Sequence, residues 1–130
     1  MTRITSFTKL ENELIPKFRE SMGLAESTAD VQKFFVYTIM ELLNGVQADH
    51  TEKIDILYED VVLTPGQAPG YTLAPRLTEH SPLAAELQGS DLPAILARFA
   101  EVAGKRHAYL AKKPEKTEAK MYHGVGQPVR

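Results

Sequence analysis

The sequence predicts a mostly α-helical domain: a compact bundle of four to five helices around a buried central helix over residues 31–46. Apolar residues recur at helical spacing in three long segments, as they do in amphipathic helices. Capping residues, glycines and prolines separate these segments from one another. The chain has 130 residues, of which 43% are hydrophobic and 25% charged. This size and composition are typical of one globular domain.

The first helix is expected to begin near Ser6 or Thr8. Thr8 and Glu11 have the spacing of a capping box, in which a hydroxyl and a carboxylate each accept an unpaired backbone N–H. An apolar side chain then recurs every fourth residue, at Leu10, Leu14, Phe18 and Met22. Pro16 lies inside this pattern and removes a backbone donor, so we expect either a kinked helix or two short ones.

The central helix is predicted by residues 31–46, which follow the capping residues Ser27, Thr28 and Asp30. Its apolar side chains surround most of its circumference: Phe34, Phe35, Val36, Tyr37, Ile39, Met40, Leu42 and Leu43. One neighbouring layer could not cover such a helix, so we expect it at the centre of the domain. A position in a subunit interface is the alternative.

Residues 51–63 fit two templates. A helical face matches five apolar positions and strand alternation matches three, so the spacing favours a helix. The alternative is a small β-hairpin near 61–73, in which 61–63 pairs with 71–73 across the Pro- and Gly-rich loop 64–70. That variant would make the fold α+β.

Two further helices are predicted near the end of the domain. A short one begins at Ser81-Pro82 and runs to Leu87, and a long one begins near Asp91 and ends at about Ala111, before Pro114. The expected core comprises Leu10, Leu14, Phe18, Phe34, Phe35, Ile39, Leu42, Leu43, Leu57, Val61, Ile95, Leu96 and Phe99. We expect residues 1–112 to form the helical domain, and 113–130, which lack periodicity, to be a flexible basic tail.

The charge of the chain is divided along its length. The net charge of −2 combines a balance of −7 over residues 1–104 with +5 over residues 105–130. The most acidic stretch is 49–60, with five carboxylates and one lysine. Such a division lets two surfaces of opposite sign meet different partners, or each other.

Motifs for catalysis and cofactor binding are absent from the sequence. There is no cysteine, no two of the four histidines have the spacing of a helical metal pair, and no phosphate-binding loop occurs. Glu52, Asp55 and Glu59 would share a helical face that could hold a hard cation, but charged faces are commonly only solvated. We therefore expect no cofactor and no metal, and the sequence favours a non-enzymatic protein while leaving the question of an enzyme open.

The candidate partner-binding residues are basic side chains around one tyrosine: Lys105, Arg106, Tyr109, Lys112, Lys113, Lys116 and Lys120. They predict a small non-enzymatic adaptor, regulator or accessory factor that binds an acidic protein partner, or residues 49–60 of a second copy of itself. The chain shows neither a secretory signal nor an apolar run long enough for a bilayer, which leaves the cytoplasm as the expected compartment.

Two other functions stay open. Lysines beside a tyrosine can follow a phosphate backbone and stack on a base, so the 105–120 segment could bind nucleic acid. The overall pI of about 6.1 argues against this, because nucleic-acid-binding domains are usually basic. The 64–80 loop could instead serve a small enzyme or ligand binder, using a histidine or a carboxylate.

Overall fold

The computed structural model describes residues 6–48, 50–67, 69–79 and 83–112. Its three long helices are α1 (Thr8–Leu24), α2 (Thr28–Val46) and α5 (Leu92–Ala111). Between α2 and α5 come a 3₁₀ turn, η1 (Tyr58–Asp60), the strands β1 (Val61–Leu63) and β2 (Tyr71–Leu73), and the short helices α3 (Pro75–Thr78) and α4 (Leu83–Gly89). The mostly helical bundle and its hairpin variant are both confirmed.

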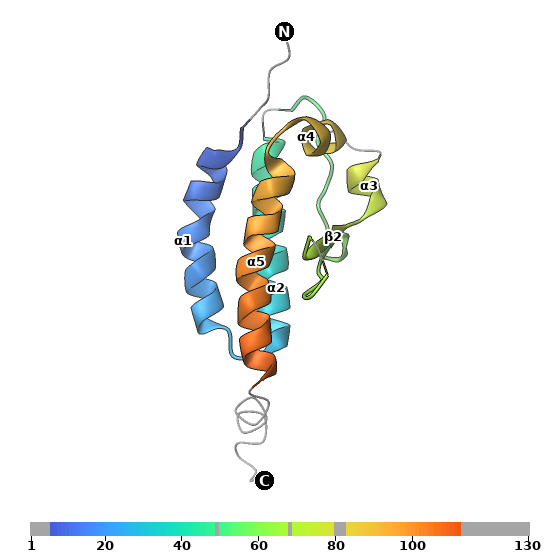
Figure 1. The fold of residues 1–130 in the computed structure, drawn as a ribbon. Coiled ribbons are helices and arrows are strands. Elements are labelled where there is room, and N and C mark those ends of the chain that lie inside the picture. The colour runs from blue at the N-terminus through green and yellow to red at the C-terminus, as the bar shows by residue number, and fades with distance from the viewer. Residues whose placement is uncertain (1–5, 49, 68, 80–82, 113–130) are drawn as a thin grey trace.

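The three long helices pack on one another, and α2 also packs against the hairpin and the 3₁₀ turn η1. α1 and α5 lie side by side with α2 behind α5, and the hairpin, α3 and α4 cover the other side (Figure 1). Ser27 caps α2 by accepting a hydrogen bond from the Asp30 N–H (3.1 Å). Seven of its side chains are buried: Val31, Phe35, Val36, Ile39, Leu42, Leu43 and Val46. The predicted central helix is therefore confirmed.

The core is built around three phenylalanines, one from each long helix. The Phe18 ring meets Phe99 edge-on, with centroids 5.1 Å apart, and Phe35 at 6.5 Å. Of the predicted core, Leu10 and Phe34 are only partly buried. Leu57 is 42% exposed, so that prediction is wrong. The reason is that Leu57 precedes a 3₁₀ turn and lies on no helical face.

The helix expected over residues 51–63 is wrong. Residues 51–57 contain no helix, and Val61–Leu63 pairs antiparallel with Tyr71–Leu73. Val61 and Leu63 point into the core while Val62 points outward, which is the two-residue period of a strand. The loop supports the hairpin, because the Thr64 N–H donates to the Gly70 carbonyl (2.8 Å) and the Gln67 N–H to the Thr64 carbonyl (3.2 Å).

α1 departs from its sequence signals in two ways. It is one continuous helix through Pro16, whose exposed ring leaves the buried stripe of Leu14, Phe18 and Met22 intact. The predicted capping box is absent, because the residue before the helix is Phe7, and the Thr8 N–H donates to the Ser6 hydroxyl (3.3 Å) instead. Among the described helices, none is both long enough and apolar enough to cross a membrane.

Candidate interaction surface

The described part of the predicted basic site lies at the end of α5. Lys105, Tyr109 and Lys112 are spaced by four and three residues, so they share one face of the helix. All three are exposed: the Lys105 side chain is 78% accessible and Tyr109 is 45% exposed. We call these three residues the α5-end surface. Lys113, Lys116 and Lys120 lie outside the described residues.

Arg106 has a different position from its neighbours. Its Nη2 donates to the Ala25 carbonyl (2.9 Å) and the Gly23 carbonyl (3.4 Å), at the end of α1. Its guanidinium also lies over the Tyr109 ring, 5.1 Å from the centroid. Backbone carbonyls at a helix end carry partial negative charge, which favours a cation there. Arg106 thus fixes α5 against α1 and holds the Tyr109 ring in place.

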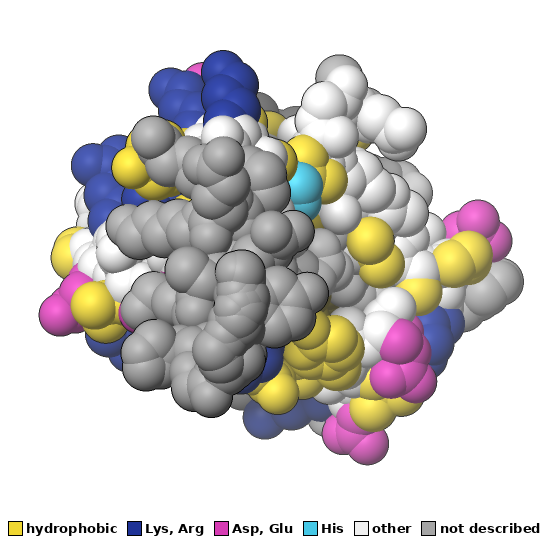
Figure 2. Space-filling model, turned by 90° about the horizontal axis from the view of Figure 1, so that it is seen from below, with side chains coloured by type: hydrophobic (Ala, Val, Ile, Leu, Met, Phe, Trp, Pro, Cys, Tyr) yellow, Lys and Arg dark blue, Asp and Glu magenta, His cyan; other side chains and the backbone are white. Residues whose placement is uncertain are grey.

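The α5-end surface stays basic although one of its two lysines pairs with a carboxylate. The Lys105 ammonium lies 3.7 Å from the Glu101 carboxylate one turn earlier, an exposed pair that contributes little binding energy of its own. Lys112 follows the last residue of the helix and is exposed. Figure 2 shows the molecule from the end at which α5 terminates, where Lys and Arg side chains gather at the upper left and Asp and Glu side chains lie at both the left and the right edges.

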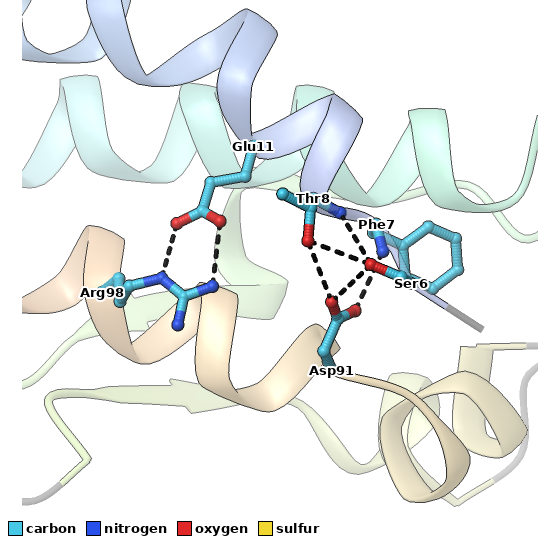
Figure 3. Close-up of polar contacts among 6 residues, drawn as sticks. All are labelled: Ser6, Phe7, Thr8, Glu11, Asp91 and Arg98. Carbon is cyan, nitrogen blue, oxygen red and sulfur yellow. Dashed lines mark hydrogen bonds and ion pairs between the residues drawn. The ribbon is translucent and has the colours of Figure 1, made fainter. Parts of the chain in front are cut away.

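The opposite end of the α1–α5 contact is also polar. The Asp91 carboxylate accepts hydrogen bonds from the Phe7 N–H (2.9 Å) and from the Ser6 (2.8 Å) and Thr8 (3.3 Å) hydroxyls (Figure 3). Partial burial alone would raise the pKa of the Asp91 carboxyl. The hydrogen bonds outweigh it and lower the pKa below its usual value.

One turn further along, Arg98 and Glu11 form a two-point ion pair. Arg98 Nε donates to Glu11 Oε2 (2.6 Å) and Nη2 donates to Oε1 (2.9 Å) (Figure 3). The Glu11 hydrogen bonds, the largest effect, raise the pKa of Arg98. Helices α1 and α5 are therefore joined at both ends by hydrogen bonds between residues more than 80 positions apart in sequence, from side chain to side chain at one end and from side chain to backbone at the other.

Tyr37 and the exposed residues of 55–59 form a second exposed surface. Tyr37 of α2 and Tyr58 of η1 meet edge-on with centroids 5.4 Å apart, and they are 55% and 41% exposed. Leu57, Asp55 and Glu59 are exposed beside Tyr58 in the chain. The sequence indicated the acidic charge of this segment but not the tyrosine pair, because Tyr37 was expected to be covered and Tyr58 to lie in a helix.

The carboxylates weighed as a cation site do not gather. Within the residues that the structure describes, no three His, Asp or Glu side chains are placed to hold a metal ion. Asp60 is buried and forms an ion pair with Arg76, which also donates to the Asp55 carbonyl (3.0 Å). This arrangement fixes the start of the hairpin to α3.

The loop 64–70 borders an open groove against α5. Its described lining combines small and apolar residues with one amide and one exposed carboxylate: Pro65, Gly66, Gln67, Pro69, Gly70, Ala100, Glu101 and Gly104. That set contains neither a histidine nor a buried carboxylate. His107 is partly buried elsewhere on α5, and His80 lies outside the described residues. The groove gives no support to an enzyme or ligand binder.

Comparison with protein-family models, with curated proteins and with solved structures finds no match to this chain.

Proposed function

We propose that this chain is a small cytoplasmic, non-enzymatic interaction protein, an adaptor, regulator or accessory factor. It binds a protein partner, or a second copy of itself, through the α5-end surface. The observation that carries the proposal is the arrangement around Tyr109. An exposed aromatic ring lies between two exposed lysines on one helix face, and Arg106 holds both ring and helix in place.

A fixed aromatic side chain is well suited to protein recognition. Tyrosine supplies a large apolar area with few rotatable bonds, and it is enriched among residues that dominate interface energies. The lysines at its sides add attraction to an acidic partner, chiefly through the rate of association. The contact with the Arg106 guanidinium favours one position of the ring, which reduces the conformational entropy lost on binding.

The experiment compares the full chain with Lys105→Glu/Lys112→Glu as baits in a lysate of the source organism. The proteins captured are identified and then purified for binding measurements. We expect the wild-type chain to bind a purified partner at least about tenfold more tightly than the variant. Lys9→Glu/Arg19→Glu is the control, since both residues are exposed on α1. Equal binding by wild type, variant and control would overturn the proposal.

Nucleic acid is the second candidate, favoured by the exposed Tyr109 ring between Lys105 and Lys112. The probe is a labelled single-stranded oligonucleotide. If the lysines contact phosphates, the logarithm of affinity falls with the logarithm of salt concentration by about 0.7 per contact. Loss of Tyr109 should then cost about 1–3 kcal/mol per stacked base. Absence of binding at low salt would remove this function.

A further inference from the structure

The second exposed surface leaves three large apolar side chains accessible to solvent, and no contact among the described residues accounts for this. It consists of Tyr37, Leu57 and Tyr58, with Asp55 and Glu59 beside them. We call it the acidic aromatic patch. The three apolar side chains are between 41% and 55% exposed, although both tyrosine rings are already in contact. Paired aromatic rings with an accessible face are typical of the centre of a protein interface.

The charges around the patch are predominantly acidic. The Asp60 carboxylate is buried and offset by Arg76, so that pair adds no net charge to the surface. Glu52, Asp55 and Glu59 are exposed, while Lys53 is the one exposed cation among the described residues of 50–60. The patch therefore favours an occupant that combines positive charge with an aromatic or aliphatic side chain.

The α5-end surface has this chemistry. It presents the Tyr109 ring between Lys105 and Lys112, and the sequence continues with Lys113, Lys116 and Lys120. Within one copy, Lys105 pairs with Glu101, and no ion pair between described residues joins Lys105 or Lys112 to Asp55 or Glu59. Both surfaces stand on described, packed elements. A rigid helix end cannot bend back to its own hairpin, so the two surfaces can meet only between molecules.

We propose that the α5-end surface of one copy binds the acidic aromatic patch of a second copy, and that two such contacts close a dimer. This inference rests on the proposed function, because it uses the same α5-end surface and names its partner. When each copy places its α5-end surface on the acidic aromatic patch of the other, both surfaces of both copies are covered. The dimer is then closed and has no free surface of this kind to bind a third copy. The aromatic side chains supply apolar burial at each contact, and the opposite charges set its orientation.

The test is sedimentation of the full chain and two charge-reversal variants. Asp55→Lys/Glu59→Lys changes the patch, and Lys105→Glu/Lys112→Glu changes the α5-end surface. We expect the wild type to dimerise, with a dissociation constant that rises as NaCl increases from about 50 mM to about 500 mM, because salt screens exposed charges. Each variant alone should dimerise at least about tenfold more weakly.

The decisive sample is an equimolar mixture of the two variants. In a mixed dimer the unchanged lysines of one copy meet the unchanged carboxylates of the other, and the reversed charges meet each other with opposite signs. We expect the mixture to dimerise about as tightly as the wild type. Glu13→Lys/Lys9→Glu, on exposed positions of α1, is the control and should behave as the wild type.

Three results would overturn the inference: a monomeric wild-type chain, a dimer that neither variant weakens, or a mixture that fails to recover. Circular dichroism of each variant at the same concentration establishes that it is folded. A monomeric chain whose Lys105→Glu/Lys112→Glu variant loses a purified partner would leave the proposed function standing while removing the dimer.

Discussion

The carboxylate of Asp91, at the start of α5, accepts a hydrogen bond from the backbone N–H of Phe7 (2.9 Å), 84 residues away at the start of α1. Asp91 makes no side-chain capping bond to its own helix; instead the Ser90 hydroxyl accepts the Leu92 N–H (3.1 Å). The carboxylate at the start of α5 therefore holds the start of α1 rather than capping its own helix, and the consequences can be measured.

The first prediction concerns the stability that this carboxylate provides. Asp91→Ala removes the acceptor for one backbone N–H and two hydroxyls, and hydrogen bonds to a charged group are stronger than average. We expect a loss of about 1–2 kcal/mol in the free energy of unfolding, measured by urea denaturation. Glu13→Gln, at an exposed position of α1, should change it by less than about 0.5 kcal/mol. A loss no larger than that control's would contradict the prediction.

The second prediction concerns pH. The pKa of Asp91 is lower in the folded than in the unfolded chain, so the unfolded chain binds more protons as the solution is acidified. The contribution of Asp91 to stability is complete above its ordinary pKa of about 3.9 and is lost as the pH falls through the lower folded value. The stability difference between wild type and Asp91→Asn should therefore shrink between neutral pH and about pH 3. A difference that stays constant would show that the charge is not involved.

The third prediction concerns Gln47, whose amide is buried. Its Nε2 donates to the Ile54 carbonyl (2.6 Å) and its Oε1 accepts from the Ile54 N–H (3.1 Å). Gln47→Leu keeps a similar volume but leaves both backbone groups without these partners. We expect a loss of about 2–3 kcal/mol in unfolding free energy. Asn44→Ala, which removes only a 3.3 Å contact from Nε2, should cost less than about 1 kcal/mol; equal losses would contradict the prediction.

The fourth prediction compares two glycines of the hairpin loop. Both have positive φ, +83° at Gly66 and +99° at Gly70. A Cβ at Gly66 would enter open space, whereas one at Gly70 would lie 3.0 Å from the Ala100 Cβ. We expect Gly66→Ala to cost about 1–2 kcal/mol through backbone strain, and Gly70→Ala about 1 kcal/mol more through the contact.

A double-mutant cycle isolates the contact from the strain. Ala100→Gly relieves the 3.0 Å approach, so it should couple favourably with Gly70→Ala in unfolding free energy. The same substitution should be additive with Gly66→Ala. Favourable coupling with both glycines, or with neither, would show that the extra cost of Gly70→Ala does not come from contact with the Ala100 side chain.

The long helices could be predicted from sequence because their signals are local. Leu14, Phe18 and Met22 recur at helical spacing, and Ser27 caps the helix that follows it. The segment 51–63 was misjudged because tertiary contacts decide its path. Gln47, seven residues earlier, holds the backbone of Ile54, and Arg76, 16 residues later, holds Asp60; neither contact follows from the local apolar spacing. The short helix Pro75–Thr78 was also missed, since it offers only one turn of pattern.

The candidate site was partly predictable for the same reason. The spacing of Lys105, Tyr109 and Lys112 shows that they share a helix face whatever the tertiary fold. That Arg106 differs from its neighbours could not be predicted, because its acceptors belong to the end of α1. Tyr37 and Tyr58 likewise become one surface only when the hairpin packs on α2.

The attachment of α1 at both ends affects how the chain folds as it is synthesised. α1 leaves the ribosome first and can pack on α2 soon afterwards, yet its end contacts use Asp91, Arg98 and Arg106. None of these can form until nearly the whole domain has been translated. Among the described helices, α1 therefore has the longest delay between its synthesis and the formation of its end contacts, and part of its apolar stripe stays uncovered until α5 is made.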